Sequence, residues 1–406
     1  MNLRIYNKGV LGETRFSTRI EIYKYKWGMH MKFLHTADLH IGKSIYEFNM
    51  LEDQRYILQE ILQIADEEKV DAILLAGDIY DRSVPSTEAV QLLEWFLMEA
   101  LKIAPVFMIS GNHDSAERLS FGAGLFEKNG LYIAGGRDVK EVFLQDEYGR
   151  VAVHMLPFVK PAVVGAANCE EAVAKQLEQW KENWNAEDRH VLMTHFFVCA
   201  GGKEPELSDS EVRGFVGGLE QVDVSLFGAY DYVALGHIHK PQAMKRGQTY
   251  YAGSPLCYSF SECTPTNKAV NIIELGESGE TEIYRKVLHP RRQMRILRGS
   301  LAELVKQGNE EEKGREDYIQ AILTDKDELI DPIGTLRSVY PNTMQIVLEK
   351  RLAEGSTPLF HGAESKAKTM VELFSDFYEN LAGEPMDAER IEIVREVAEE
   401  IEGKSL

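Results

Sequence analysis

The sequence predicts an α/β fold with a largely buried sheet, because short apolar runs alternate with helical stretches from Met31 to about Lys286. A second observation supports this: polar side chains of metal-binding type follow each run at once. The runs, which we interpret as strands, are Phe33-Leu34, Ile73-Leu74-Leu75-Ala76, Val106-Phe107-Met108-Ile109, Val191-Leu192-Met193 and Val233-Ala234-Leu235.

Two helices are predicted between the first three runs. The first carries an apolar stripe on one face. Its residues are Ile57, Leu58, Ile61, Leu62, Ile64 and Ala65. The second helix is predicted from Thr87 to Leu101. Helices that separate short buried strands in this way are typical of an α/β domain, which we expect over residues 31–290.

The composition changes after Pro290, which indicates a smaller domain of mixed α and β structure over residues 291–359. It includes a strand candidate over residues 318–323. From residue 364 onward the pattern predicts two helices separated by Gly383-Glu384-Pro385, a break that helices rarely cross. We therefore expect a helical segment over residues 360–406, with its apolar stripes buried on this chain or on a partner.

Residues 1–30 differ from the rest, with an excess of Lys and Arg and no apolar core run. We expect a disordered or spurious extension there, with the functional chain starting near Met29 or Met31. No cleavage site follows a hydrophobic segment, so a secretory signal is not predicted.

Composition limits the function classes. A chain of 406 residues fits two or three domains, and no apolar run approaches the roughly 20 residues of a membrane helix. The four cysteines lack the spacing of a zinc site or a disulfide framework, which favours a reducing, cytoplasmic setting. The net charge of −20 argues against a protein that holds nucleic acid through its overall field.

The polar motifs at the strand ends are the main functional signal. They are Asp38-Leu39-His40, Gly77-Asp78, Gly111-Asn112-His113-Asp114, His195 and Gly236-His237-Ile238-His239. Because ligand sites in open α/β sheets lie outside the carboxyl ends of the strands, these residues are expected to converge on one cleft. A single such motif is more often structural, whereas five together favour a metal site.

Asp, His and Asn side chains suit manganese, iron or zinc and disfavour a thiolate-bound structural zinc. Two ions need a shared carboxylate between them, and together they can clamp a phosphate and activate a water. The other histidines are interpreted as structural or surface residues, although His35 is close to the first motif in sequence. They are His30, His35, His154, His190, His289 and His361.

These motifs resemble the signature of the calcineurin-like metallophosphoesterases, which implies a β-sandwich flanked by helices around a dinuclear site. Longer strings resemble the SbcD family of bacterial nuclease subunits, and the segment from Asp331 to Asn342 resembles that family's capping domain. The strings are His35-Thr36-Ala37-Asp38 with Gly42-Lys43, Gly77 to Asp81, Gly111 to Ser115 with Arg118-Leu119, and Gly253-Ser254-Pro255 with Ser259-Phe260-Ser261-Glu262.

The resemblance implies roles for individual residues. One metal would be held by Asp38, His40, Asp78 and His239. The other would be held by Asp78, Asn112, His195 and His237, which makes Asp78 the bridge. His113, next to Asp114, matches a histidine that stabilises or protonates the leaving oxygen, a role that suits an imidazole tuned by a neighbouring carboxylate. Asp81 is either a turn residue or a support for these ligands.

The resemblance further implies a manganese-dependent DNA nuclease with two divalent ions, acting as an exonuclease on double-stranded ends and an endonuclease on hairpin or single-stranded DNA. It implies an SbcC-type ATPase partner, and a homodimer within a heterotetramer, in DNA repair, recombination and replication at the nucleoid. Two alternatives stay open: a stand-alone phosphoesterase with a small substrate, which the acidic charge suits, and a catalytically inactive scaffold.

The basic stretch over residues 285–298 has two interpretations, a phosphate-steering surface or a solvated linker. Its basic residues are Arg285, Lys286, Arg291, Arg292, Arg295 and Arg298. The acidic C-terminal segment is not expected to touch DNA, because its charge repels phosphates.

Overall fold

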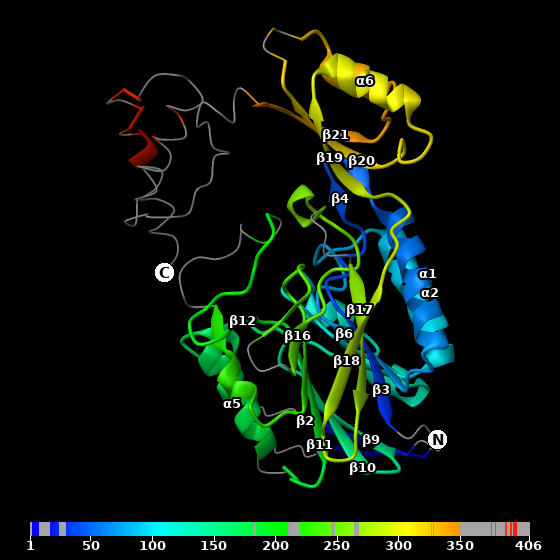
Figure 1. The fold of residues 1–406 in the computed structure, drawn as a ribbon. Coiled ribbons are helices and arrows are strands. Elements are labelled where there is room, and N and C mark those ends of the chain that lie inside the picture. The colour runs from blue at the N-terminus through cyan, green and yellow to red at the C-terminus, as the bar shows by residue number, and fades with distance from the viewer. Residues whose placement is uncertain are drawn as a thin grey trace. The chain divides into compact units, whose positions relative to one another are not determined.

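The computed structural model describes most of the chain up to residue 349 (Figure 1). The described residues are 2–7, 17–23, 30–181, 184–209, 211, 220–244, 248–263, 268–325, 327, 329–349, 375, 378, 386, 387, 390, 391 and 393–395. Two compact units divide the chain, residues 1–347 and residues 348–406. The predicted C-terminal helical pair therefore lies almost entirely outside the described residues.

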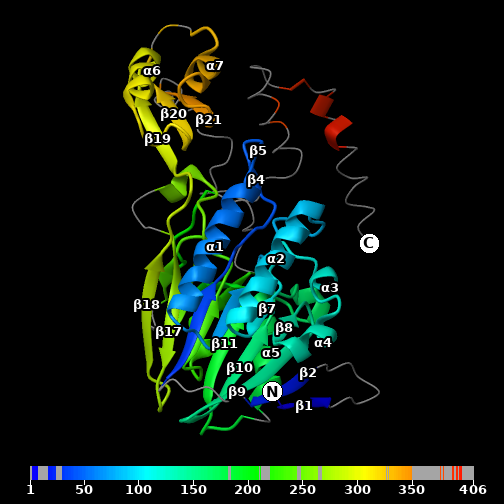
Figure 2. The same cartoon turned by 90° about the vertical axis from the view of Figure 1, so that its right-hand side faces the viewer.

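The first sheet of the larger unit has the order β18-β17-β3-β6-β7-β8, with β3, β6, β7 and β8 parallel. Its strands are β3 (Met31–Thr36), β6 (Ala72–Ala76), β7 (Val106–Ile109), β8 (Leu131–Ala134), β17 (Ala269–Leu275) and β18 (Thr281–Val287). Helices α1 (Leu51–Glu67) and α2 (Thr87–Ile103) lie side by side on its outer face (Figure 2). Their apolar stripes pack on Leu34, Ile73 and Leu75 in one core.

The second sheet has the order β1-β2-β9-β10-β11-β14-β16-β15, with β10, β11, β14 and β16 parallel. Its strands are β1 (Asn2–Asn7), β2 (Ser17–Tyr23), β9 (Val139–Asp146), β10 (Gly149–Leu156), β11 (Arg189–Thr194), β14 (Tyr232–Leu235), β15 (Gln242–Ala243) and β16 (Thr249–Tyr251). Helix α5 (Cys169–Lys181) packs on its outer face through Val173 and Trp180.

A shared core between the two sheets makes the sandwich. Phe33, Leu74 and Phe107 of the first sheet belong to the same buried cluster as Val153 and Val191 of the second. This arrangement confirms the predicted sandwich of two sheets flanked by helices. It also brings the carboxyl ends of β3, β6, β7, β11 and β14 to one edge.

Residues 1–30, where a disordered or spurious extension is predicted, include two described strands. β1 pairs with β2, and β2 runs parallel to β9 at the edge of the second sheet (Figure 2). The segment Arg19-Ile20-Glu21-Ile22 alternates polar and apolar residues, as a strand does.

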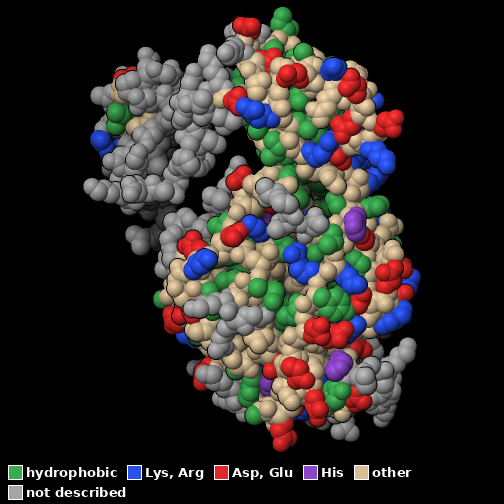
Figure 3. Space-filling view, viewed as in Figure 1, with side chains coloured by type: hydrophobic (Ala, Val, Ile, Leu, Met, Phe, Trp, Pro, Cys, Tyr) green, Lys and Arg blue, Asp and Glu red, His purple; other side chains and the backbone are tan. Residues whose placement is uncertain are grey.

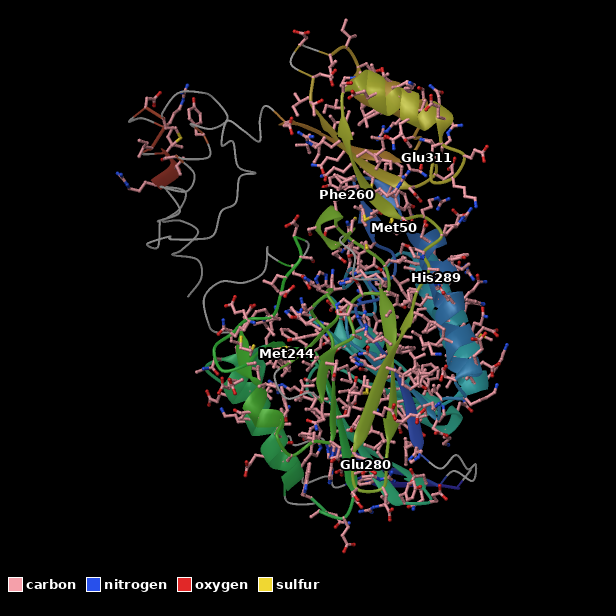
Figure 4. All side chains as sticks on the ribbon, viewed as in Figure 1. Met50, Met244, Phe260, Glu280, His289 and Glu311 are labelled. Carbon is pink, nitrogen blue, oxygen red and sulfur yellow. The ribbon has the colours of Figure 1, made fainter. Side chains whose placement is uncertain are left out.

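The smaller part of the first unit is a three-stranded sheet, β19-β20-β21, with two helices. Its elements are β19 (Met294–Gly299), α6 (Leu301–Glu310), β20 (Tyr318–Leu323), α7 (Pro332–Arg337) and β21 (Thr343–Leu348). The Tyr318 hydroxyl donates to Asp53 Oδ2 of α1 over 2.8 Å. Figure 4 labels Met50 and Phe260 where this sheet meets the sandwich.

Short elements complete the described part of the chain. They are β4 (Ser44–Ile45), β5 (Phe48–Asn49), α3 (Ala116–Leu119), α4 (Ala123–Phe126), β12 (Phe197–Cys199), β13 (Gln221–Asp223) and the 3₁₀ turns η1 (Glu127–Asn129), η2 (Pro161–Val164), η4 (Val224–Phe227) and η5 (Phe260–Cys263). Among the described helices, none has the length and apolar character needed to cross a membrane.

Candidate metal centre

The candidate ligands all lie in loops that leave the carboxyl ends of parallel strands. Asp38 and His40 follow β3, and Asp78 follows β6. Asn112 and His113 follow β7. His195 follows β11, and His237 and His239 follow β14, so both sheets contribute to the site. Residues separated by roughly 200 positions in the chain meet because the sandwich places these strand ends at one edge.

The backbone at these positions is unusual. Asp38, His40, Asp78 and His237 have positive φ angles of 53°, 43°, 47° and 101°. Such conformations cost a non-glycine residue on the order of 1–3 kcal/mol and cluster at functional sites. They let side chains that follow a straight strand turn inward toward a common point.

Two glycines permit the close approach of the loops. A Cβ atom on Gly77, at φ +90°, would lie 2.3 Å from His195 Nδ1. On Gly111 it would lie 2.1 Å from Asp78 Oδ1. Both distances are far below van der Waals contact, so the Gly-Asp and Gly-Asn strings are required by packing as well as by chemistry.

The first group of donors is Asp38, His40 and His239. All three are buried, and their ligand atoms lie within 4.8 Å of one another. His40 Nε2 and His239 Nε2 are 3.0 Å apart. Asp38 Oδ2 is buried without a hydrogen-bond partner in the described structure, and such an atom is expensive to bury alone. A divalent cation would satisfy this oxygen, so the group fits a metal ion.

The second group lies around Asn112, whose Oδ1 is 3.1 Å from His195 Nε2 and 3.0 Å from His237 Nδ1. Asp78 lies between the two groups. Its Oδ2 is 3.4 Å from His195 Nε2 and 3.7 Å from His40 Nε2. Oxygen and imidazole donors from both groups therefore surround one shared carboxylate, as two neighbouring ions need.

Burial and neighbouring charges shift the pKa values of these residues in opposite directions. Burial raises the pKa of Asp38 to about 6. Burial lowers the pKa of His195, but Asp78 and Asp38 outweigh it and raise that pKa to about 9. Burial lowers the pKa of His237 to about 3. Metals bind the neutral form of imidazole, so a metal ion at His195 would compete with a proton.

His113 is exposed, as is its neighbour Asn112, and 43% of the His113 side chain is accessible. Its Nε2 lies 3.9 Å from Asp78 Oδ2, and its Nδ1 lies 3.0 Å from the backbone carbonyl of Asp81. Asp114, the carboxylate predicted beside this ring, accepts hydrogen bonds from the backbone N–H groups of Ile79, Tyr80 and Gly111.

Loop geometry explains why Asp114 contacts backbone N–H groups. Neighbouring side chains at a loop point in different directions, and the Asp114 carboxylate turns back toward three backbone N–H groups of the β6 and β7 loops. Burial and the charge of Asp78 raise the pKa of Asp114 to about 6 even though these hydrogen bonds favour its ionised form. Asp114 thus ties the two loops together, while Asp81 supplies the partner of the His113 ring.

Two of the ring nitrogens that face away from the site have an oxygen close by. His195 Nδ1 lies 2.8 Å from the backbone carbonyl of Ala76, and His239 Nδ1 lies 3.5 Å from Glu262 Oε1. His40 Nδ1 is buried without a hydrogen-bond partner among the described residues, 3.7 Å from Asp81 Oδ1. Metal-binding histidines commonly have such a partner, which fixes the ring and its tautomer. Sequence reasoning missed Glu262 as a functional residue, although it belongs to the string over residues 259–262.

A cavity of about 530 Å³ opens onto the site. His40, Asp78, Asn112 and His113 line one part of it. The remaining wall combines three phenylalanines and a cysteine with two lysines, two glutamates and two histidines. Its residues are Lys43, Phe158, Lys160, Cys169, Phe196, Phe197, Glu211 and Glu220, together with His237 and His239. The site can therefore hold a phosphate with an apolar group beside it.

Ion pairs occupy most of the basic stretch. Lys286 pairs with Glu68 at 2.5 Å, and Arg291 pairs with Glu52 at 2.6 Å. Arg292 pairs with Asp53 at 2.7 Å, and Arg295 with both Glu311 and Asp317 at 2.9 Å. Lys and Arg are intermixed with Asp and Glu on the face shown in Figure 3. These pairs favour a structural role over a phosphate-steering surface.

His289 also contacts an acidic side chain of the surface. It is labelled in Figure 4 beside α1, and its Nδ1 lies 2.7 Å from Glu60 Oε1. Its position, away from the metal-type residues, agrees with its interpretation as a surface residue.

Comparison with known proteins gives two family matches. The calcineurin-like phosphoesterase model matches residues 31–241. A model described as the Type 5 capsule protein repressor C-terminal domain matches residues 290–381.

Curated relatives cover nearly the whole chain. The SbcD subunit of the SbcCD nuclease from Staphylococcus epidermidis is 33% identical over 361 residues, which are 86% of this chain and 93% of the relative. The SbcD subunit of the SbcCD nuclease from Staphylococcus saprophyticus is 31% identical, over 87% of this chain and 94% of the relative.

Solved structures match at lower identity. The crystal structure of TT1561 of Thermus thermophilus is 14% identical, covers 63% of this chain and 99% of that chain, and has a TM-score of 0.40, too low to support an inference. The curated relatives and the phosphoesterase model carry the assignment. This chain belongs to the calcineurin-like phosphoesterases and, within them, to the family of SbcD nuclease subunits.

Proposed function

We propose that this protein is a manganese-dependent DNA nuclease, an exonuclease on double-stranded ends and an endonuclease on hairpin or single-stranded DNA. One observation carries the proposal: Asp78 Oδ2 lies within 3.4–3.9 Å of ring nitrogens of His195, His40 and His113 at a cavity whose wall includes phenylalanines. The names of the curated relatives support the same activity.

The proposed ligands are Asp38, His40, Asp78 and His239 for one ion and Asp78, Asn112, His195 and His237 for the other. Asp78 is the proposed bridge. When bound, two such ions polarise the phosphate oxygens and lower the pKa of a water that attacks phosphorus. Oxygen and imidazole donors without thiolates suit Mn²⁺.

His113 is the proposed proton donor. Hydrolysis adds water to phosphorus and breaks one P–O bond, and the departing oxygen needs a proton. The His113 ring is exposed at the cavity, close to Asp78, and the carbonyl of Asp81 orients it. An imidazole in this position can deliver that proton.

The phenylalanines of the cavity wall favour a nucleotide over a small polar phosphoester. Phe158 is partly buried, lines the cavity and packs on Phe196 with ring centroids 5.3 Å apart. An aromatic face of this kind can stack on an unpaired base, and Lys160 in the same wall can meet a phosphate. The alternative, a stand-alone phosphoesterase, gives these side chains no role.

The decisive experiment measures cleavage of linear and hairpin DNA with Mn²⁺, with and without an SbcC-type ATPase. We expect cleavage that chelation abolishes and that the ATPase stimulates. Rapid hydrolysis of a small phosphomonoester, with both DNA substrates intact under every condition, would instead establish the alternative.

The proposed partner is an SbcC-type ATPase, bound through residues 360–406. Deleting residues 364–406 should leave a folded protein that cleaves short single strands with Mn²⁺ but fails to co-purify with the ATPase. Early melting of the truncated protein with the partner still captured would assign those residues to this chain's own core. The proposed setting is the cytoplasm, on nucleoid DNA, in repair, recombination and replication.

A homodimer within a heterotetramer is the proposed assembly. Phe121, in the turn between α3 and α4, and Leu125 and Phe126 on α4 expose apolar surface that a second copy could cover. Light scattering of the Phe121→Glu variant tests this: the wild type should be dimeric and the variant monomeric, whereas an unchanged dimer would place the interface elsewhere.

A further inference from the structure

Glu262 is a buried carboxylate in a loop that none of the proposed ligands occupies. It lies in η5, and only 2% of its side chain is accessible. One oxygen, Oε1, lies 3.5 Å from His239 Nδ1. The other, Oε2, accepts from Lys268 Nζ over 2.5 Å. The carboxylate therefore joins a candidate ligand to a buried lysine.

Lys268 holds the backbone of the same histidine. Its side chain is 6% accessible, and Nζ donates to the carbonyl of His239 over 3.0 Å. It also donates to Ser254 Oγ over 2.8 Å. The ring of His239 thus has Glu262 behind it, while its backbone carbonyl is held by Lys268.

The opposite face of the ring looks into the site, where His239 Nε2 lies 3.0 Å from His40 Nε2. A carboxylate behind a ligating imidazole keeps the proton on the far nitrogen and frees the near one for a cation. A buried ion pair is weak evidence for stability by itself, because desolvation offsets the attraction. Stability alone is therefore a poor reason for placing this pair behind His239.

We propose that the Glu262–Lys268 ion pair is a positioning device for His239, holding its ring and backbone so that Nε2 points at the ion shared with Asp38 and His40. The inference rests on the proposed function, since it presumes that His239 is a ligand. Removing a partner of this kind commonly weakens metal binding by about 10–100-fold.

The chain offers a matched control in Glu127 and Lys140. They form another buried ion pair, 2.7 Å between Glu127 Oε1 and Lys140 Nζ, with side chains 6% and 4% accessible. Neither residue belongs to the groups of metal-type side chains found among the described residues. The variant Glu127→Gln breaks a pair of similar burial away from the site.

The test titrates the metal-free full chain with Mn²⁺ and follows binding calorimetrically, for wild type, Glu262→Gln and Glu127→Gln. We expect two ions in the wild type. Glu262→Gln should bind one of them about 10–100-fold more weakly and keep the other, while Glu127→Gln keeps both affinities even where it lowers the melting temperature. Glu262→Asp, which restores the charge, should recover part of the loss.

Unchanged binding of both ions by folded Glu262→Gln would overturn the inference and leave the proposed function intact. A wild type that binds no metal would overturn the proposed function itself. If Glu262→Gln fails to fold because Lys268 is left unpaired, the double variant Glu262→Gln with Lys268→Met removes both charges. That variant should fold and show the same weakened ion, and wild-type affinity in it would refute the positioning role.

Discussion

Two pairs of buried histidines have the same distance between their nearest ring nitrogens but different surroundings. In one pair, His40 Nε2 and His239 Nε2 are 3.0 Å apart, and in the other, His154 Nε2 and His190 Nδ1 are also 3.0 Å apart. The first pair lines the large cavity and lies among Asp38 and Asp78.

The second pair is enclosed by aromatic rings. His154 packs on Trp180 at 4.8 Å and on Trp184 at 5.6 Å between ring centroids, and Trp184 stacks on His190 at 3.5 Å. Glu141 Oε1 lies 3.8 Å from His154 Nδ1, and Asp231 Oδ2 accepts a hydrogen bond from the backbone N–H of His190. Close histidines therefore do not define a metal site. The first pair belongs to clustered groups of three donors and lines an open cavity, and a divalent cation needs both several converging ligands and access.

The largest effect on metal binding at the first pair is expected from Asp78→Asn. The amide keeps the shape but removes the shared charge, so both ions should be lost or weakened. Losing several kcal/mol of charge stabilisation corresponds to a fall in rate of about 10³-fold or more. Metal analysis and nuclease assays measure both effects, and His154→Gln serves as the control that should keep both ions. Two retained ions with near-normal hydrolysis would show that Asp78 is not the bridge.

His113→Ala tests the exposed histidine of the first region. Because Asn112 supplies a donor from the same loop, we expect the variant to keep its ions and to lose about 10²–10⁴-fold in kcat, the usual effect of removing a positioned acid. Calorimetric metal titration and single-turnover cleavage separate the two effects. Loss of an ion would move His113 into the set of ligands.

Phe158→Ala tests whether the cavity wall stacks on a base. Base stacking on an aromatic ring contributes roughly 1–3 kcal/mol, so KM for a short single strand should rise about 5–100-fold. A strand with an abasic site at the cleaved position should show little change. Tyr56→Ala, at an aromatic residue on α1 that is 44% accessible and outside the cavity lining, is the matched control. Equal effects on both strands would argue against stacking.

The smallest expected effect is a change in the pH dependence of folding stability, caused by the second histidine pair. Burial and the neighbouring His190 lower the pKa of His154 well below its ordinary value of 6.5. The unfolded chain therefore binds the extra proton below about pH 6.5, and the stabilisation present above that pH is lost as the pH falls, by at most about 1.4 kcal/mol per pH unit.

His154→Gln removes this group, so its melting temperature should fall less steeply than that of the wild type between about pH 7.5 and 5. Thermal unfolding with excess chelator measures this without a contribution from bound metal. Parallel curves for the two proteins would show that His154 titrates normally in the folded state.

Local sequence patterns were sufficient for the elements that build the site. The run Ile73 to Ala76 lies in β6, Val106 to Ile109 is β7, and the predicted helix from Thr87 is α2, which ends at Ile103 instead of Leu101. These succeed because periodicity and apolar runs report directly on burial. The same patterns placed every candidate ligand directly after a strand, and parallel strand ends share one edge.

Long-range pairing was decided only in the tertiary structure. Glu262 lies behind His239, and Asp81 behind His40, because separate loops meet at the sandwich edge. Likewise, Arg292 has no evident partner in the local sequence but meets Asp53 of α1, 239 positions away. The ends of strands can be predicted from the local pattern, because the apolar or polar character of each residue indicates whether it is buried. The partners of a buried charge depend on which loops the folded sheets bring together, and no local pattern encodes that.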